Sequence, residues 1–361
     1  MARIDERPFI AIWETTQACD LACQHCRASA RPDRSAGELD TEEAKRLLDT
    51  LADAGVPLVV LTGGDPAKRE DLVELIAHGS RRGLNMGLTP SATPLVTTEL
   101  IEQLGKAGLS RLAVSIDAPD AAGHDAFRGV AGSFDLSLRI LSDARRFGIR
   151  TQINTSIHAG NLQWLEAMTP VVRAAGAVLW SVFFVVPTGR AQSRMVPDAA
   201  LVEDALGRLA DIADREPFAV KTTAAPHYRR ILIERKASRS HGTHGSHGLR
   251  VNDGRGFLFI SHLGELYPSG FLPVSCGNVR TNHPLSVYRF HPVFRALRDP
   301  HALTGKCGAC EYRAVCGGSR ARAYATTGSL LASDPLCAYV PPDYVPEEQP
   351  SYARRYLDVV R

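Results

Sequence analysis

The chain contains 361 residues, which exceeds the usual size of a single domain, so we expect one large domain and a smaller one. Its 42 basic side chains nearly balance the 39 acidic ones, and the resulting net charge of +3 argues against a nucleic-acid partner. The longest apolar stretch, residues 177–187, is far shorter than the roughly 18 residues that a membrane-spanning helix needs, so we expect no membrane partner.

The first half of the chain alternates short apolar runs with amphipathic stretches, which is typical of repeated βα units around a parallel sheet. The amphipathic stretches have apolar residues at helical spacing, and Asp40 with Glu43 fits a capping box where the first of them begins. Six units are fewer than the eight of a closed barrel, so the fold class that we predict is α/β, with a partial (β/α)6 TIM-like barrel. The expected strands are 9–14, 57–62, 84–89, 111–116, 150–157 and 178–186, and the expected helices are 41–54, 69–82, 96–107, 133–147 and 161–175.

The second half of the chain is predicted to contain a linker, a small domain and a tail. The linker includes a His/Gly loop, in which His241, His244 and His247 are either metal ligands or part of a flexible connector. A hairpin pattern then opens a small cysteine-rich α+β domain. The predicted domains are the partial barrel over residues 1–190, the helical linker with its His/Gly loop over 191–255, the cysteine-rich domain over 256–345 and the C-terminal tail over 346–361.

The eight cysteines fall into two groups, with Cys276 alone between them. Because the first residues contain no apolar signal segment, we expect a cytoplasmic protein with reduced thiols, in which bunched cysteines are metal ligands or catalytic groups. The first group, Cys19, Cys23 and Cys26, directly follows the first expected strand, where the active sites of parallel βα folds collect. Three thiolates bind three irons of a four-iron cube and leave the fourth iron open to a ligand. A zinc site is the alternative, but zinc usually takes four ligands in spaced pairs.

The spacing Cys-x3-Cys-x2-Cys resembles the cluster-binding loop of the radical S-adenosylmethionine (SAM) superfamily, and this resemblance covers nearly the whole chain. It implies a [4Fe-4S] cluster on Cys19, Cys23 and Cys26, whose open iron chelates the amino and carboxylate groups of SAM. It also implies reductive cleavage of SAM to a 5′-deoxyadenosyl radical that abstracts hydrogen from a substrate. A one-electron reductant such as flavodoxin or ferredoxin is then the expected protein partner.

Further segments resemble the SAM-binding positions of the superfamily, in the same order along the chain. Gly63 and Gly64 begin a Gly-Gly-Asp-Pro motif that is similar to Gly-Gly-Glu-Pro, whose backbone binds the SAM amino group, and Asp65 replaces the Glu. Where many relatives carry Thr-Asn-Gly, this chain offers Ser91 or Thr93 in place of the Asn. The alternative for each position is a strand-end polar group that is satisfied within the protein. The other positions that the resemblance assigns to SAM are Ser115 and Asp117 beside the ribose, Asn154 on the fifth strand, and Pro187 and Arg190 beside the adenine.

The second group of cysteines provides four thiols, which are enough to saturate a further four-iron cluster. Such a cluster serves electron transfer or structure, and zinc on the same thiols is an alternative. The region resembles the SPASM/twitch auxiliary-cluster domain, but Ser269 and Arg320 stand where a full SPASM domain has additional cysteines. The resemblance therefore implies one auxiliary [4Fe-4S] cluster, and Cys276 is interpreted as a packed or loop cysteine. The four expected ligands are Cys307, Cys310, Cys316 and Cys337.

Within the superfamily, residues 13–30 and the single auxiliary cluster are most similar to enzymes that trim tetrapyrrole side chains, the haem-forming decarboxylases and their haem d1 relatives. The resemblance implies a tetrapyrrole substrate. Arg128, after the fourth strand, is either a ligand for a substrate carboxylate or a solvated loop arginine. SPASM enzymes that modify ribosomally made peptides offer a second interpretation. A third is a non-catalytic iron–sulfur or zinc scaffold that leaves SAM intact.

Overall fold

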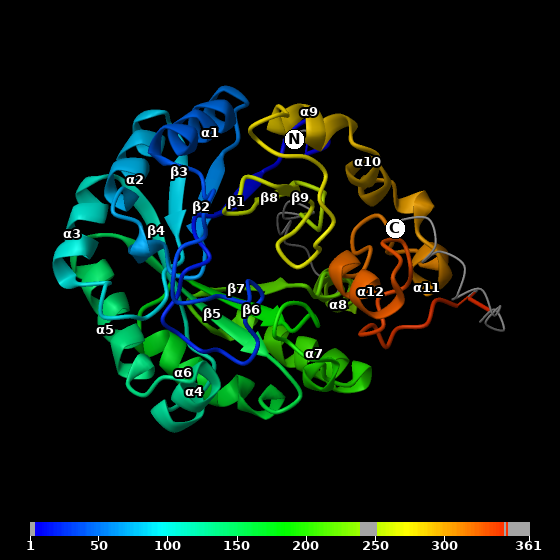
Figure 1. The fold of residues 1–361 in the computed structure, drawn as a ribbon. Helices are drawn as coiled ribbons and strands as arrows, with labels where there is room; N and C mark the ends of the chain where they lie inside the picture. Colours follow the sequence, from blue (N-terminus) through cyan, green and yellow to red (C-terminus); the bar gives the residue numbers. More distant parts are fainter. Residues whose placement is uncertain (1–3, 239–250, 343, 346–361) are drawn as a thin grey trace.

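The computed structural model describes residues 4–238, 251–342 and 344–345, and within them nine strands form one sheet (Figure 1). The strand order is β7-β6-β5-β4-β3-β2-β1-β8-β9, and neighbouring strands are parallel except for the antiparallel pair β8 and β9. The sheet curls, and helices cover its outer face (Figure 1). The predicted partial barrel is therefore confirmed.

Strands and helices alternate as far as β7, and α9 to α12 follow the last two strands. The strands are β1 (Ile10–Glu14), β2 (Leu58–Thr62), β3 (Asn85–Leu88), β4 (Leu109–Ser115), β5 (Arg150–Ile157), β6 (Leu179–Phe184), β7 (Ala219–Thr223), β8 (Phe257–Ile260) and β9 (Leu266–Tyr267). The helices are α1 (Thr41–Asp53), α2 (Leu72–Arg81), α3 (Thr98–Lys106), α4 (Ala121–Arg128), α5 (Ser133–Arg146), α6 (Leu165–Ala174), α7 (Ala199–Arg215), α8 (Tyr228–Ser238), α9 (Pro284–Phe290), α10 (Pro292–Arg298), α11 (Gly305–Ala309) and α12 (Arg320–Thr327).

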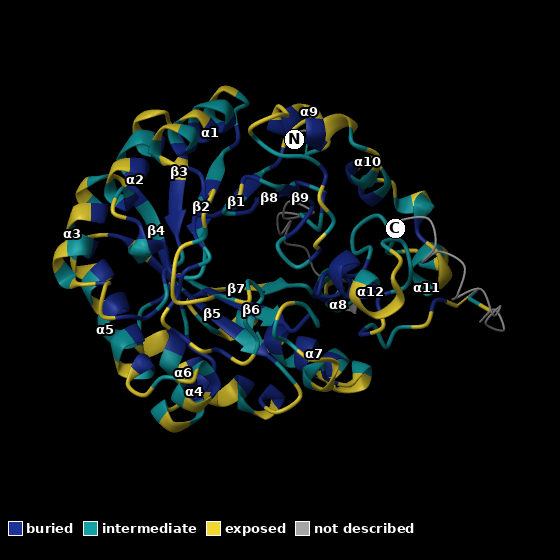
Figure 2. Cartoon of the chain, viewed as in Figure 1, coloured by how far each residue is buried: buried dark blue, intermediate teal, exposed yellow. Residues whose placement is uncertain are grey.

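The core lies between the sheet and the helices that surround it. Trp13 of β1, Trp180 of β6 and Leu51 of α1 are fully buried in one continuous cluster, and burying each such side chain contributes roughly 1.5–3 kcal/mol. Figure 2 shows the same division, since the outer helices are buried toward the sheet and exposed on the opposite side. The predicted capping box is confirmed, because Asp40 and Glu43 each accept the backbone N–H of the other at the start of α1.

The structure contains elements that the sequence patterns did not predict. Strand β7 lies in the stretch that was expected to be helix and loop, and it extends the sheet beyond β6. Helix α4 lies in the connection between β4 and α5. The predicted hairpin is present as β8 and β9, and β8 also pairs in parallel with β1, so that Phe259 lies opposite Ile12. The hairpin therefore continues the barrel sheet.

The part of the chain that begins at β8, called the C-terminal segment from here on, lies at the open side of the curled sheet (Figure 1). At one edge β8 pairs with β1. At the other edge Arg322 of α12 donates to the carbonyl oxygen of Phe184, at the end of β6, at 3.2 Å and to that of Ala224, just after β7, at 2.7 Å. Ala224 has a φ of 56°, which is uncommon for a residue with a side chain. The segment thus connects the two edges of the partial barrel.

Some predictions lie beyond what the structure describes or tests. The loop with His241, His244 and His247 and the tail over 346–361 are outside the described residues. The predicted domain boundaries stay predictions. Among the described helices, none combines the length and the apolar character that a membrane crossing requires.

Candidate active site

The three cysteines of the first group lie in one loop at the carboxyl end of β1. Cys19 and Cys23 are buried and pack together with Cys26, and all three thiols are free. The N–H of Cys19 donates to the carbonyl oxygen of Arg31 at 2.8 Å, and the N–H of Cys26 donates to that of Cys23 at 3.3 Å. These bonds fold the loop back on itself. Three thiols therefore converge at the end of the sheet where active sites of parallel βα folds collect.

The glycine pair after β2 brings a second loop against the cysteine loop. The N–H of Gly64 donates to the carbonyl oxygen of Thr16 at 2.8 Å, and the N–H of Asp65 donates to that of Ala18 at 2.6 Å. A Cβ atom on Gly63 would lie 2.6 Å from the Thr16 oxygen, and one on Gly64 would lie 2.3 Å from the Ala18 oxygen. Both positions therefore require glycine so that the two loops can come into contact. The motif alone did not reveal this reason for the glycine pair.

The carboxylate of Asp65 is buried and engaged within the protein. It accepts a hydrogen bond from Thr93 Oγ1 at 2.6 Å and one from the N–H of Ser91 at 3.2 Å. Burial raises the pKa of Asp65 despite these bonds. The Ser91 hydroxyl in turn lies 3.2 Å from Cys19 Sγ. Asp65 thus holds the turn that contains Ser91 and Thr93 beside the cysteine loop. This is the turn whose sequence differs from Thr-Asn-Gly.

Buried Asp117 and largely buried Arg128, whose side chain is 11% exposed, form an ion pair next to the cysteine loop. Arg128 Nη2 lies 2.5 Å from Asp117 Oδ2, and Arg128 Nη1 lies 3.7 Å from Cys23 Sγ. The other carboxylate oxygen of Asp117 accepts the N–H of Ser156 at 2.7 Å. Gly129 ends α4 in the left-handed conformation immediately after Arg128. Arg128 is therefore not solvated, and it connects a strand-end carboxylate to a thiol of the loop.

The charges of this pair stabilise each other in spite of burial. Burial would raise the pKa of Asp117, but the positive charge of Arg128 lowers it. Burial likewise opposes the charge on Arg128, but Asp117 and Cys23 raise its pKa. A guanidinium beside a cysteine favours the thiolate, which is the form that binds metal. No motif links Cys23 to Arg128, because the two residues are far apart along the chain.

Three aromatic rings from separate segments stack beside the loop. His25, between Cys23 and Cys26, stacks on Phe127 with 4.2 Å between ring centroids, and Phe127 stacks on His158 at 4.6 Å. Burial lowers the pKa of His25 to about 3, so its ring is neutral. Sequence reasoning missed this stack, since no spacing in the chain relates its three members.

The turn after β6 contacts the cysteine loop directly. The N–H of Arg190 donates to the carbonyl oxygen of Cys26 at 3.0 Å, and Arg190 Nη1 donates to that of Ala30 at 3.3 Å. Gly189 has a φ of 61°, and a Cβ atom there would lie 2.4 Å from the Cys26 oxygen. Pro187 begins this turn. The predicted SAM-binding segments after β2, β4 and β6 thus contact the cysteine loop or, after β4, connect to it through Arg128.

Ser115 and Asn154 occupy a different position, on the strands themselves. They lie opposite each other on β4 and β5, and Ser181 of β6 is the next residue in the same row. Gln152 Nε2 donates to Asn154 Oδ1 at 2.7 Å. These polar residues alternate with core residues that face the helices, so they line the inner face of the sheet.

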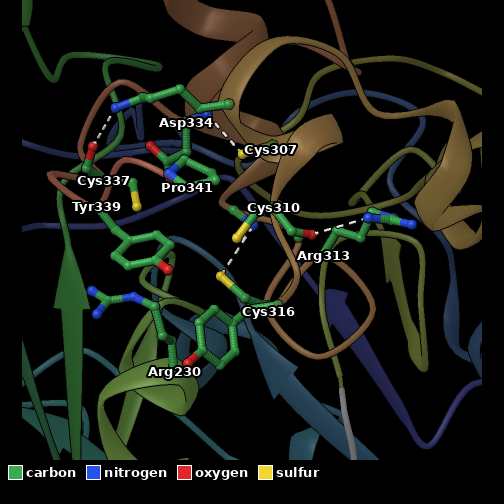
Figure 3. A pocket seen from close by; sticks show the side chains of 13 residues that line it. Arg230, Cys307, Cys310, Arg313, Cys316, Asp334, Cys337, Tyr339 and Pro341 are labelled. Atoms are coloured by element: carbon green, nitrogen blue, oxygen red, sulfur yellow. Dashed lines mark hydrogen bonds between the residues drawn. The ribbon is translucent and has the colours of Figure 1, made fainter. Parts of the chain in front are cut away.

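The four cysteines of the second group line one pocket in the C-terminal segment (Figure 3). The pocket has a volume of about 410 Å³ with its open mouth included. The N–H of Asp334 donates to Cys307 Sγ, and the N–H of Gly318 donates to Cys316 Sγ, both at 3.4 Å. Burial raises the pKa of Cys316 to about 12 and that of Cys337 to about 11, so metal binding must displace their protons.

Both sets of thiols fit iron–sulfur clusters. Among the described residues, no three His, Cys, Asp or Glu side chains converge closely enough for a single metal ion. Four thiols around a pocket suit a saturated four-iron cube, whereas three thiols in a loop suit a cube with one open iron. Backbone N–H groups that point at sulfur stabilise bound thiolates in either case.

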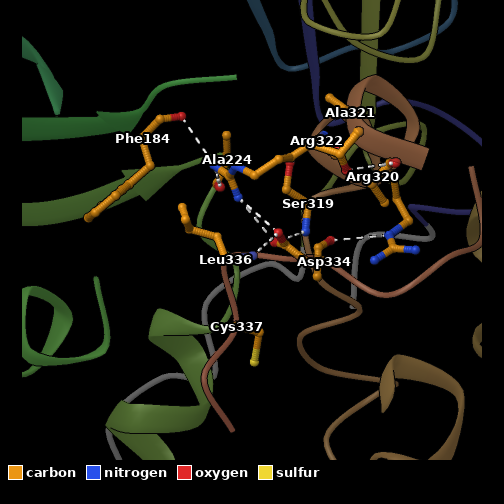
Figure 4. Close-up of polar contacts among 12 residues, drawn as sticks. Phe184, Ala224, Ser319, Arg320, Ala321, Arg322, Asp334, Leu336 and Cys337 are labelled. Atoms are coloured by element: carbon orange, nitrogen blue, oxygen red, sulfur yellow. Dashed lines mark hydrogen bonds and ion pairs between the residues drawn. The ribbon is translucent and has the colours of Figure 1, made fainter. Parts of the chain in front are cut away.

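Two buried arginines of α12, Arg320 and Arg322, contact residues that line the pocket (Figure 4). Arg320 donates to the carbonyl oxygen of Ala332 at 2.6 Å, and its Nη2 lies 3.6 Å from Cys307 Sγ. Arg322 and Asp334 form an ion pair at 3.1 Å in which both side chains are 0% exposed. Burial would raise the pKa of Asp334, but the charge of Arg322 lowers it. Arg320 thus places its positive charge beside the sulfur of Cys307. A full SPASM pattern has a further cysteine at the position of Arg320.

Ser269 and Cys276 are not among the residues that line this pocket. The hydroxyl of Ser269 accepts the N–H of Phe271 at 3.2 Å within a turn. Cys276 lies in the main core cluster, and its Sγ donates to the carbonyl oxygen of Val274 at 3.4 Å. Burial raises the pKa of Cys276 to about 12. These contacts are those of a packed thiol.

Comparisons with known proteins define the class to which this fold and site belong. Residues 13–164 match the radical SAM superfamily. Over 337 residues the chain is 43% identical to a protein of Nitratidesulfovibrio vulgaris named AdoMet-dependent heme synthase, with 91% of this chain and 92% of the relative covered. The chain therefore belongs to the radical SAM superfamily, and it is an iron–sulfur enzyme that uses a [4Fe-4S] cluster and SAM.

Two further similarities extend over nearly the whole chain. A Methanosarcina barkeri protein, also named AdoMet-dependent heme synthase, is 39% identical over 349 residues, with 94% of this chain and 99% of the relative covered. The solved structure of Streptococcus suis SuiB bound to S-adenosylmethionine has a TM-score of 0.73 at 18% identity, covering 92% of this chain and 78% of SuiB. At that identity the likeness to SuiB concerns the fold, and its coverage includes the C-terminal segment.

Proposed function

We propose that this chain removes carboxyl groups from the side chains of a tetrapyrrole during haem formation. The observation that carries the proposal is the 43% identity, over 91% of the chain, to a protein named AdoMet-dependent heme synthase. The two sets of thiols support it. When a side chain loses a hydrogen atom and its carboxylate leaves as CO2, one electron must be accepted, and a second cluster gives that electron a destination.

In this proposal Cys19, Cys23 and Cys26 hold the cluster that binds SAM. When bound there, the cluster and SAM supply a 5′-deoxyadenosyl radical that takes a hydrogen atom from the substrate. The Ser91 hydroxyl beside Cys19 and the Arg128 guanidinium beside Cys23 fix the loop and stabilise its thiolates.

We propose that SAM lies between the glycine pair after β2 and the turn that contains Pro187 and Arg190. The Nε and Nη2 atoms of Arg190 are buried without a hydrogen-bond partner among the described residues, so they are available to a ligand. Both carboxylate oxygens of Asp117 are already engaged, so its role is to hold Arg128. Ser115 and Asn154 are then the polar residues that are available to the ribose.

The second group of cysteines holds an auxiliary [4Fe-4S] cluster in this proposal. We propose residues 256–345 as a SPASM/twitch domain and residues 1–190 as the barrel domain that generates the radical. A one-electron reductant such as flavodoxin or ferredoxin would deliver the electron for SAM cleavage. The four cysteines of the pocket would hold a cluster that can accept the electron released by the substrate.

An anaerobic assay with the reconstituted full chain, dithionite and SAM tests the proposal. The substrates are an iron porphyrin with propionate side chains and a candidate precursor peptide. We expect 5′-deoxyadenosine together with a porphyrin product that is lighter by the mass of CO2 and H2. A modified peptide and an unchanged porphyrin would instead support a peptide maturase. If no 5′-deoxyadenosine forms with the porphyrin and none forms with the peptide, the result would support a non-catalytic scaffold.

A further inference from the structure

Among the described residues, the inner face of the barrel carries two cations that have neither an ion pair nor a side-chain hydrogen bond, and their interpretation rests on the proposed function. Successive side chains of a strand point to opposite faces of the sheet. Leu112 and Val114 of β4 are fully buried in the core beneath the helices, and Val220 of β7 packs against the same core. Arg111 and Lys221, one residue away on these strands, therefore lie on the inner face.

Lys221 lies opposite Ser181 of β6. Its side chain is exposed, yet desolvation by the surrounding protein lowers the pKa of its ammonium group, and the charges of Arg229 and Arg111 lower it further. A lysine on an outer surface is exposed without such desolvation. The register with Ser181 places Lys221 on the wall of the barrel interior, and the lowered pKa agrees with this position.

Arg111 lies between Gly87 of β3 and Arg150 of β5. Its Nε is buried and has no hydrogen-bond partner. Burial and the charge of Arg150 lower the pKa of Arg111. Within the described ranges, neither Arg111 nor Lys221 makes an ion pair or a side-chain hydrogen bond.

The acidic residue on the inner face of β1 does not neutralise these cations. The carboxylate of Glu14 lies 2.6 Å from Arg27 Nη2 and 2.7 Å from His262 Nδ1, so it is already paired. Gln152 and Ser181, on the strands between β4 and β7, are uncharged. The described wall of the interior therefore carries positive charge without a matching carboxylate, which favours an anionic ligand.

We propose that Arg111 and Lys221 bind carboxylate groups of the substrate inside the barrel. Strands β4 and β7 are three strand spacings apart, roughly 14 Å between their backbones. Lys221 lies in the row of Ser115, whereas Arg111 lies four residues nearer the amino end of β4, so the two cations occupy different parts of the interior wall. This arrangement suits one molecule that carries carboxylates at separate positions. A tetrapyrrole with several propionate side chains has that form, whereas its ester derivative lacks the charges.

Binding measurements on the reconstituted holoenzyme test this site separately from turnover. The ligands are an iron porphyrin with free propionates, its fully esterified derivative and an acidic peptide. The variants are Lys221→Met and Arg111→Met, and the control is Lys106→Met on the outer helix α3, where the lysine is exposed. We expect each inner-face variant to weaken binding of the free porphyrin at least about 10-fold and to leave binding of the ester unchanged.

Iron content and the affinity for SAM should match the wild type in every variant, which shows that each has folded. Lys221→Arg and Arg111→Lys keep the charge and should restore most of the affinity. Equal affinity of the wild type and both Met variants for the free porphyrin would overturn the carboxylate site and leave the proposed function standing. If the wild type binds no porphyrin but binds the acidic peptide through Lys221, the site stands and the tetrapyrrole proposal fails. If neither ligand depends on Lys221 or Arg111, the carboxylate site is refuted.

Discussion

The two cysteine sites differ in the number of their thiols, but in each of them an arginine lies beside a cysteine sulfur and stabilises the site. The loop after β1 offers three thiols, with Arg128 at 3.7 Å from Cys23. The C-terminal pocket offers four, with Arg320 at 3.6 Å from Cys307. Each site thus presents a guanidinium to a sulfur, whereas only the count of thiols decides whether an iron stays open to SAM. Ligand number therefore separates radical generation from electron transfer in our proposal.

The largest expected effect is the loss of the three-thiol site. Cys26→Ala should reduce 5′-deoxyadenosine formation to background, because two thiols do not hold a four-iron cube in place. Cys276→Ala is the matched control, since that thiol packs in the core and should leave the iron content unchanged. The measurement is quantification of 5′-deoxyadenosine together with iron analysis. If Cys26→Ala cleaved SAM as fast as the wild type, the three-thiol site would not be the site of SAM cleavage.

Removing a ligand from the four-thiol site should have a different consequence. Cys310→Ala should lower the iron content from about eight to about four per chain and should spare SAM cleavage. Substrate product should be lost, because the released electron has no acceptor. Full product formation by this variant would refute the electron-transfer role of the pocket.

The buried ion pair between Arg322 and Asp334, beside the four-thiol pocket, should show the next largest effect, on stability. Arg322→Met leaves Asp334 as a buried carboxylate without its partner and should lower the free energy of unfolding by about 3–5 kcal/mol. The double variant Arg322→Met/Asp334→Leu removes both charges and should recover part of that loss, since the carbonyl oxygens of Phe184 and Ala224 stay without their donor. Denaturant unfolding measures both variants. A single variant as stable as the wild type would contradict the importance of this ion pair.

A smaller effect is expected when the cation beside the three-thiol site is removed. Arg128→Met should slow SAM cleavage by about 10–100-fold, because the residue orients and stabilises a ligand thiolate. Arg128→Lys should restore part of the rate. Iron content distinguishes a loss of cluster from a loss of activity, and unchanged kinetics in Arg128→Met would show that the guanidinium has no part in SAM cleavage.

The smallest expected effect concerns a surface contact between helix α1 and the segment that follows β9. Arg280, after β9, pairs with Glu43 of α1 at 2.6 Å, and its hydrogen bond lowers the pKa of Glu43 from 4.5 to about 2. Glu43→Gln should cost less than ~1 kcal/mol, since exposed ion pairs contribute little. The depressed pKa means that the contribution is present above pH 4.5 and is lost as the pH falls toward about 2. A stability difference that keeps its full size below pH 2 would contradict this assignment.

The sequence predicts the elements that depend on local periodicity and misses those that depend on distant contacts. Strands β1 to β6 are recognisable because their apolar residues recur in short runs between amphipathic helices. Strand β7 escapes prediction because polar residues, Lys221 to Thr223, follow Val220, so the strand has no apolar run. Its pairing with β6 decides its conformation.

The same limit applies to the candidate sites. The cysteine spacings predict both sets of thiols as ligands, and the structure brings the thiols of each set together. The surroundings of these thiols were not predictable, because Arg322 contacts Phe184 and Arg128 contacts Cys23 only after folding brings separate segments together. The placement of Asp65 toward Ser91 is also a tertiary feature, since the two residues belong to loops after different strands.

Electron paramagnetic resonance of single-site variants tests the central difference between the two sites most directly. In reduced Cys310→Ala, which keeps the three-thiol site, we expect SAM to change the spectrum of the cluster because one iron is open. In reduced Cys26→Ala, which keeps the four-thiol site, we expect the spectrum to stay the same when SAM is added. A spectrum of Cys310→Ala that does not respond to SAM, or one of Cys26→Ala that does, would contradict the division of roles between the two sites.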